Sequence, residues 1–156
     1  MSATLAQDLN IVIRGQPAYE KMLPLDTSAA QVVYKGMAMI IDNSQDTLNI
    51  AIADGITVTT SDVFIGISAG YYSVAISDPE TTYPQIITWP SIVGFKSTAL
   101  TNASIGQAVY ASAYTATGVT LSTSVGAYPR LGLLWLVENG YAFILIDPPT
   151  KVLAVS

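Results

Sequence analysis

The sequence contains no cysteine and no histidine among its 156 residues. These absences exclude a disulfide, a thiolate nucleophile and any metal site built on thiolate or imidazole ligands. They also remove the side chain that most often serves as general acid or base near neutral pH. Enzymes that depend on a catalytic cysteine or histidine are therefore excluded.

Charge is scarce as well. Charged residues make up 11% of the chain and hydrophobic residues 51%, whereas soluble domains average about 25% charged residues. A chain with so few charges either stays soluble by other means or has much of its surface covered by a partner, and we interpret the composition as that of an assembly subunit.

Positive charge is the scarcer kind, since six basic and eleven acidic side chains give a net charge of −5. The basic residues are scattered singly along the chain, at Arg14, Lys21, Lys35, Lys96, Arg130 and Lys151. Because nucleic-acid binding depends on clustered Lys and Arg, the sequence predicts no nucleic-acid partner.

Long apolar runs are also missing. The longest, Leu131 to Val137, falls far short of the ~20 residues that a membrane helix needs. The first residues carry Asp8 and lack the basic region of a secretory signal. We therefore expect a soluble protein that is made in the cytoplasm and has no membrane partner.

What the chain does contain is a series of short β-branched and aromatic runs separated by turn residues, from Val32 to Ile146. This pattern predicts an all-β protein, a single-domain antiparallel β-barrel or sandwich. We place the domain at residues 31–147, after an extended N-terminal arm (1–30) and before a short C-terminal tail (148–156). The arm holds one β-like run whose candidate partner-contacting residues are Leu9, Ile11, Ile13 and Arg14.

Two hairpins are predicted from turn dipeptides. Residues 50–59 turn at Asp54-Gly55, and a second pair of runs, 131–137 and 141–146, turns at Asn139-Gly140. The second hairpin is apolar on both faces and therefore needs cover on both. It is either a central strand pair beneath a second layer or a subunit interface. The candidate interface residues are Leu134, Trp135, Leu136, Phe143 and Ile144.

An internal similarity suggests two related β halves. Val33-Tyr34, Ile65-Gly66-Ile67 and Tyr72 to Ile76 are echoed by three later segments, which are Val109-Tyr110, Leu131-Gly132-Leu133 and Tyr141 to Leu145. After these, Pro148-Pro149 ends the last strand. The tail beyond it either adds as a strand to a neighbouring subunit or folds back on its own domain.

Motifs that could carry chemistry fail on inspection. Gly66-Ile-Ser68-Ala-Gly70 matches the nucleophile elbow, but no histidine exists to activate Ser68 and a strand follows in place of a helix. The segment 94–98 resembles the end of a phosphate loop but lacks the glycines of that motif. Asp78 and Glu80 are two nearby carboxylates, as glycoside hydrolysis requires, but they bracket a proline in a loop and no strand fixes their distance. The sequence therefore predicts no enzyme and no cofactor.

Two weaker binding sites stay open. Asp42 to Asp46 offers oxygen ligands for a surface calcium ion, although it lacks the EF-hand pattern. A sugar-binding surface could form from aromatic residues at strand ends and in loops, which are Tyr71, Tyr72, Tyr83, Trp89 and Tyr114.

The order of short motifs resembles one protein family. The motifs are Val33 to Gly36, Phe64 to Ile67, Val93 to Lys96, Ile105 to Tyr110, Gly118 to Leu121 and Leu131 to Leu133. In this order they resemble the small β-rich capsid decoration proteins of tailed bacteriophages, also called cement or head-stabilising proteins. The resemblance covers residues 31–147.

The resemblance implies a protein without catalytic activity that binds the outside of a phage capsid, as a homotrimer. Its partners would be the major capsid protein and other copies of itself, and it would stabilise the mature head by bridging neighbouring capsid proteins. It would be made in the host cytoplasm and reside on the outer surface of the virion. The alternative is a receptor- or glycan-binding module of a phage tail or fibre.

Overall fold

The computed structural model describes residues 5–21, 23–28, 30–41, 48–50, 63–124 and 130–151. Over these residues the regular elements are β-strands and one turn of 3-10 helix, joined by loops. Sheet A contains, in spatial order, β1 (Ile11–Arg14), β9 (Ile92–Lys96), β13 (Tyr141–Ile146), β12 (Arg130–Glu138), β10 (Ala108–Tyr114) and β11 (Val119–Ser122). Sheet B contains β2 (Ala18–Glu20), β8 (Ile86–Thr88), β6 (Val63–Ser68), β4 (Ala38–Ile41) and β5 (Leu48–Ile50), with β14 (Thr150–Lys151) also beside β6. A ribbon of β3 (Gln31–Val33) and β7 (Tyr72–Val74) and the helical turn η1 (Asn102–Ser104) complete the described elements.

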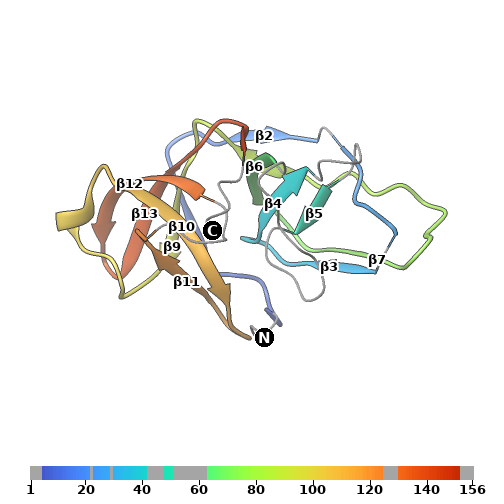
Figure 1. Cartoon of the computed structure of the whole chain (residues 1–156), viewed down its shortest axis with the longest axis horizontal. Helices are drawn as coiled ribbons and strands as arrows, with labels where there is room; N and C mark the ends of the chain where they lie inside the picture. Colours follow the sequence, from blue (N-terminus) through green and yellow to red (C-terminus); the bar gives the residue numbers. More distant parts are fainter. Residues whose placement is uncertain are drawn as a thin grey trace.

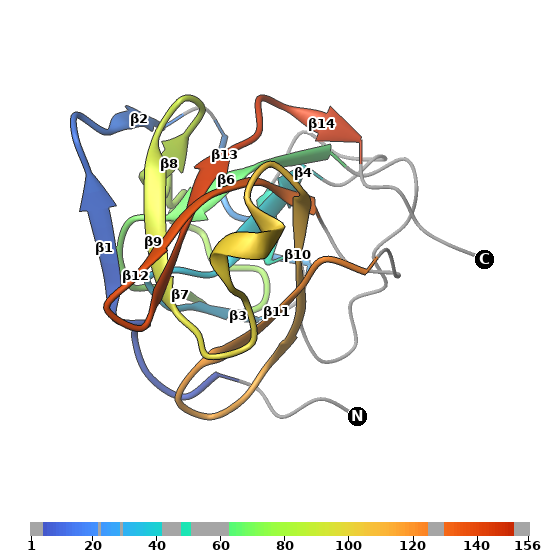
Figure 2. The same ribbon diagram turned by 90° about the vertical axis from the view of Figure 1, so that its left-hand side faces the viewer.

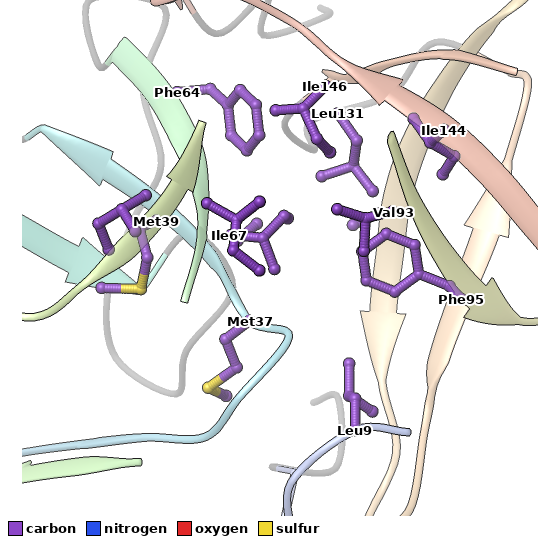
Figure 3. Packing of buried hydrophobic residues seen from close by; sticks show 14 of the residues in the cluster. Leu9, Met37, Met39, Phe64, Ile67, Val93, Phe95, Leu131, Ile144 and Ile146 are labelled. Carbon is purple, nitrogen blue, oxygen red and sulfur yellow. The ribbon is translucent and has the colours of Figure 1, made fainter. Parts of the chain in front are cut away.

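The two sheets lie side by side with the hydrophobic core between them (Figure 1). Figure 3 shows Phe64 and Ile67 of sheet B opposite Val93, Leu131 and Ile144 of sheet A, and all five are almost completely buried. Neighbouring strands are antiparallel throughout the described ladders, and each sheet is open at its edges. The all-β antiparallel prediction is thus confirmed as a sandwich-like arrangement and not as a closed barrel.

The predicted hairpin at Asn139-Gly140 is present. β12 pairs with β13 from Gly132–Ile146 to Glu138–Tyr141, and both turn residues have positive φ, +54° and +79°. Asn and Gly tolerate this conformation better than other residues, which explains the turn. The other predicted hairpin turn, at Asp54-Gly55, lies outside the described residues.

The two sheets share one topology. The spatial order of sheet B is β2-β8-β6-β4-β5, and five strands of sheet A have the order β9-β13-β12-β10-β11. Strands at the same place in the two orders also follow one another in the same sequence along the chain. Sheet A has β1 as an additional strand at its edge. The bulges agree as well. Met39 pairs with Gly66 and Val109 with Gly132, and the register shifts at the next residue of both ladders.

This arrangement confirms that the chain consists of two similar halves and corrects part of the sequence match. Ile65 to Ile67 corresponds to Leu131 to Leu133, as predicted. The counterpart of β13, however, is β8 and not the segment that starts at Tyr72, because β7 leaves the sheet to pair with β3. The counterpart of Val109 is likewise Met39 and not Val33, which lies in β3.

The N-terminal segment is not an extended arm over its described residues. β1 pairs with β9 and β2 with β8, so residues 11–20 contribute an edge strand to each sheet. Leu5 and Leu9 are buried in the core. Ile11 and Ile13 alternate with outward-facing residues, so β1 has one face turned towards the core. Pro17 lies between β1 and β2 and therefore interrupts neither strand.

The start of the C-terminal tail folds back on the chain itself. Thr150 and Lys151 pair with Phe64 and Val63 of β6. Of the two alternatives for the tail, folding back holds for these residues, while 152–156 lie outside the described part of the chain.

Candidate functional site

The outer face of sheet A, turned away from the core, carries a row of apolar and aromatic side chains. Pairing across the strands places on this face Val12, Arg14, Ile92, Leu133, Leu136, Tyr141, Phe143 and Leu145. Most of these side chains are partly exposed, and Val12 is 40% exposed. Figure 2 views the molecule from this side, with β1, β9, β13 and β12 adjacent.

A groove of about 480 Å³ lies at the β1 end of this face. It is lined by Val12, Ile13, Arg14, Gly15, Glu138, Asn139, Tyr141 and Phe143. The volume falls within the range of about 300–1,000 Å³ that is usual for ligand pockets. The groove therefore combines an aromatic floor with polar groups at its rim.

Gly94 explains how Phe143 reaches its position. The two residues are directly opposed on β9 and β13, and a Cβ on Gly94 would lie 2.7 Å from Cε1 of Phe143. The missing side chain lets the ring lie over the backbone of β9. The guanidinium of Arg14 covers the ring, with Cζ 5.2 Å from its centroid, a cation–π geometry.

Polar contacts fix the rim of the groove. Arg14 Nη1 donates to Glu138 Oε2 at 3.2 Å, and both side chains are about half-exposed. Such an exposed pair contributes little stability, so its main effect is to orient Arg14. The amide of Asn10 donates to the phenolic oxygen of Tyr141 at 2.8 Å, which ties the N-terminal segment to β13.

The residues predicted to contact a partner from the arm divide between two faces. Leu9 is buried, and Ile11 and Ile13 pack partly buried against the core, because β1 turns this face inward. The side chain of Arg14 lies on the outer face and lines the groove, which Ile13 also borders. The burial of Leu9 corrects the prediction for that residue, whereas a partner contact of Ile11, Ile13 and Arg14 stays a prediction.

The predicted interface residues divide in the same way. Leu134 and Ile144 oppose each other on the inner face and are core residues of this chain, so they do not form a contact surface. Leu136 opposes Phe143 on the outer face, and Trp135, at the bulge between Leu134 and Leu136, is 52% exposed. Phe143 is nearly buried because Arg14 covers it. The outer face has no second layer of described strands above it, so its cover is only partial.

A half-buried ion pair lies at the other end of β13. Arg130 Nε is 2.8 Å from Asp147 Oδ2. Burial raises the pKa of Asp147 above its ordinary value, and the positive charge and hydrogen bond of Arg130 lower it less than burial raises it. This pair joins the ends of β12 and β13 and lies apart from the groove lining.

The motifs that imitate catalytic sites have structural roles. Ser68 is fully buried, and its Oγ donates to the carbonyl of Gly70 at 2.7 Å, so it closes the turn after β6. Asp78 accepts the N–H of Glu80 at 3.0 Å and thereby orders its own loop. Residues 94–96 lie within β9.

No metal site was found within the described residues, where Asp and Glu form no cluster of three. The candidate calcium loop at Asp42 to Asp46 lies outside them. Of the aromatic set considered for sugar binding, Tyr114 is core, whereas Tyr71, Tyr83 and Trp89 are about half-exposed.

Sequence reasoning missed two features of the outer surface. It did not place Tyr141 and Glu138 in one groove with Arg14, since the partners are more than 120 positions apart in sequence. It also missed Ile105, which is 50% exposed beside η1. Its exposure could have been predicted from its position directly before Gly106, because an isoleucine next to a turn glycine is placed at the surface.

None of the described helical segments is long and apolar enough to cross a membrane. Comparison with known proteins finds no matching protein family, no matching curated protein and no matching solved structure.

Proposed function

We propose that the protein is a non-enzymatic structural protein that binds the outer surface of a phage capsid as an oligomer, a homotrimer in the simplest case. It stabilises the mature head by bridging neighbouring major capsid proteins. It acts on the virion surface after synthesis in the host cytoplasm, and it contacts neither nucleic acid nor membrane.

The observation that carries this proposal is the outer face of sheet A. Partly exposed apolar side chains on four adjacent strands make a contiguous surface, on which Val12 is 40% exposed. Contiguous apolar surface on a soluble domain usually marks a protein-binding site. The net charge of −5 fits a partner that is protein and not nucleic acid.

The sequence resemblance to decoration proteins supports the same function. Two of its motifs coincide with central strands, Phe64 to Ile67 with β6 and Leu131 to Leu133 with β12, and a third, Val93 to Lys96, lies on β9. Segments that resemble the family therefore contribute strands to both sheets of the sandwich.

Rebinding to phage heads tests the proposal. Expanded heads that lack the protein are mixed with purified wild-type protein, and bound copies per head are counted after sedimentation. Val12→Asp places a charge on the outer face of sheet A and is expected to lower occupancy at least tenfold. Ile76→Asp is the matched control, because Ile76 is 64% exposed in the turn after β7 and away from this face.

If wild-type protein does not bind the heads, the capsid-binding function is wrong. If Val12→Asp binds as well as wild-type protein, the function stands but the outer face of sheet A is not the contact.

A receptor- or glycan-binding function is the second candidate, and the groove favours it. Tyr141 and Phe143 provide aromatic surface, and the Arg14–Glu138 pair provides donors and acceptors for hydroxyl groups. The position of the protein in purified particles separates the two functions. Many copies on the head support decoration, whereas a few copies at the tail support adhesion.

A further inference from the structure

Two turns occupy equivalent places in the two halves. In the first half, Gly36 donates to the carbonyl of Ser68 at 2.9 Å, and Ser68 donates to Met37 at 2.8 Å. In the second half, Gly106 donates to Leu134 at 2.9 Å, and Leu134 donates back to the carbonyl of the residue after Gly106, also at 2.9 Å. Both glycines have positive φ, +93° and +86°. The turns 35–36 and 105–106 are therefore counterparts, which we call the first and second turn.

Leu9 covers the first turn. A Cβ on Gly36 would lie 2.7 Å from Cβ of Leu9, so the leucine side chain sits directly on the glycine. The N–H of Leu9 donates to the carbonyl of Lys35 at 2.9 Å, and Asp8 accepts the N–H of Lys35 at 2.9 Å. An extended segment with one leucine thus seals this turn, and Leu9 is only 6% exposed.

The second turn has no such cover within the described part of the chain. A Cβ on Gly106 would meet no atom within 4 Å, and none of the hydrogen bonds of the described residues ends on the carbonyl of Ile105. The turn follows η1 and projects at the end of the molecule away from sheet B (Figures 1 and 2).

The side chains beside the second turn are apolar, whereas the first turn carries a lysine. Ile105 stands where the first turn has Lys35, and Trp135, the extra residue of the bulge in β12, directly follows Leu134. Ile105 and Trp135 are each about half-exposed. If the second turn faced only solvent, polar side chains would be favoured beside it, because half-exposed Ile and Trp side chains leave apolar surface in water.

We propose that the second turn, with Ile105, Gly106 and Trp135, is a docking site for an extended segment of a partner chain that carries a leucine or similar branched apolar side chain. The segment binds as Leu9 binds the first turn. Its side chain lies on Gly106 and against Trp135, and its backbone N–H donates to the carbonyl of Ile105. No counterpart of Asp8 is needed, because the N–H of Ile105 already donates to Asn102 at 3.3 Å.

This site is independent of the capsid-binding function, since it is inferred from the first turn and not from the outer face of sheet A. The internal copy also supplies a probe. A synthetic peptide with the sequence of residues 5–12 contains the segment that seals the first turn, and a matched peptide with aspartate in place of Leu9 is its control.

Tryptophan fluorescence of the full chain measures binding. The chain has two tryptophans, so Trp89→Phe leaves Trp135 as the single reporter. We expect the peptide to shift Trp135 emission to shorter wavelength in a saturable manner, and the aspartate peptide to bind at least tenfold more weakly. A peptide whose leucine nitrogen is methylated loses the proposed hydrogen bond and is also expected to bind more weakly.

Two variants of the protein locate the site. Ile105→Asp is expected to lower the affinity at least tenfold. Gly106→Asn keeps a residue that tolerates positive φ and fills the open space above the turn, so it is expected to abolish binding with little change in melting temperature. Ile76→Asp is the matched surface control and should bind the peptide as the parent does.

The proposal is overturned if Trp135 shows no saturable response at millimolar peptide, or if the aspartate peptide binds equally well. Binding that survives both Ile105→Asp and Gly106→Asn in folded protein also overturns it. Gly106→Asn keeps the test decisive if Ile105→Asp does not fold.

Discussion

Gly66 and Gly132 occupy the same position in the two halves, and each lies against the backbone carbonyl of the neighbouring strand. The carbonyl of Ile87 faces Gly66, and the carbonyl of Leu145 faces Gly132. Each glycine also pairs with the last residue before the bulge, Met39 or Val109. Close approach of two backbones at a bulge requires a residue without Cβ, and both sheets meet this requirement at the same point.

Substituting either glycine with alanine is therefore expected to destabilise the protein strongly. A Cβ at Gly132 would collide with the carbonyl group of Leu145, and one at Gly66 with that of Ile87 and with Cγ2 of Ile86. Because strand backbone cannot yield as a side chain does, we expect a loss of about 3 kcal/mol or more in the free energy of unfolding, measured by urea denaturation.

Gly70→Ala is the control for these two variants. Its Cβ would lie 3.6 Å from the nearest atom, the phenolic oxygen of Tyr72, which is an ordinary contact. We expect a change within about 0.5 kcal/mol. Equal stability of Gly132→Ala and Gly70→Ala would show that the strand pairing at Leu145 is wrong.

The sequence predicted those features of the fold that depend on local pattern. The β-branched runs gave the strands, Asn139-Gly140 gave the hairpin, and the match of 65–67 to 131–133 gave the two halves. The N-terminal strands were missed because their pairing depends on contacts far along the chain. Leu9 packs on Gly36 and belongs to the same buried cluster as Phe95 of sheet A, and no short-range pattern reveals such partners.

The site was predicted less well, and one bulge explains much of the error. Strict alternation puts Leu134 and Leu136 on one face. The extra residue, Trp135, reverses this, so that Leu134 faces the core and Leu136 faces outward beside Phe143. The position of a bulge depends on packing against other strands, so the sequence alone did not indicate it.

Comparing the two equivalent turns measures how much the contact between Leu9 and Gly36 affects the free energy of unfolding. Gly36→Ala and Gly106→Ala impose similar backbone strain, because both glycines have positive φ. Only Gly36→Ala also collides with Leu9. We expect Gly36→Ala to cost about 1–3 kcal/mol more than Gly106→Ala in urea denaturation.

Combining Gly36→Ala with Leu9→Gly tests the cause of this difference, because glycine removes Cβ of Leu9, the atom nearest to the added methyl group. If the collision is responsible, the double variant loses less stability than the two single variants added together. Additive losses would contradict a direct contact between Leu9 and Gly36.

The buried hydroxyl of Tyr114 links the two halves. It accepts the N–H of Ala38 at 2.7 Å, and burial raises its pKa. Tyr114→Phe leaves that buried N–H without its acceptor, so we expect a loss of about 1–3 kcal/mol in thermal or urea unfolding. Tyr110→Phe is the control, because Tyr110 is a nearly buried tyrosine of the same strand whose hydroxyl has no hydrogen bond to another described residue. A loss of similar size in both variants would show that the bond to Ala38 is not the cause.

Asp147 should make stability depend on pH. Its pKa in the folded state is raised above the ordinary 3.8, mainly by burial and against the opposing charge of Arg130. Between 3.8 and the raised value the folded chain holds a proton that the unfolded chain has released. The contribution of Asp147 to stability therefore falls as pH rises through this window, and it is constant below and above it.

Comparison with Asp147→Asn isolates this effect from that of the other carboxylates. We expect the free energy of unfolding of the parent, minus that of Asp147→Asn, to decrease as pH rises from 3.8 through the window, as measured by urea denaturation at a series of pH values. Arg130→Gln removes the charge that opposes the shift, so the decrease should extend to higher pH in that background. A difference that stays constant or grows with pH would mean that the attraction of Arg130 outweighs the burial of Asp147, because the ionised carboxylate would then be the form that the folded chain favours.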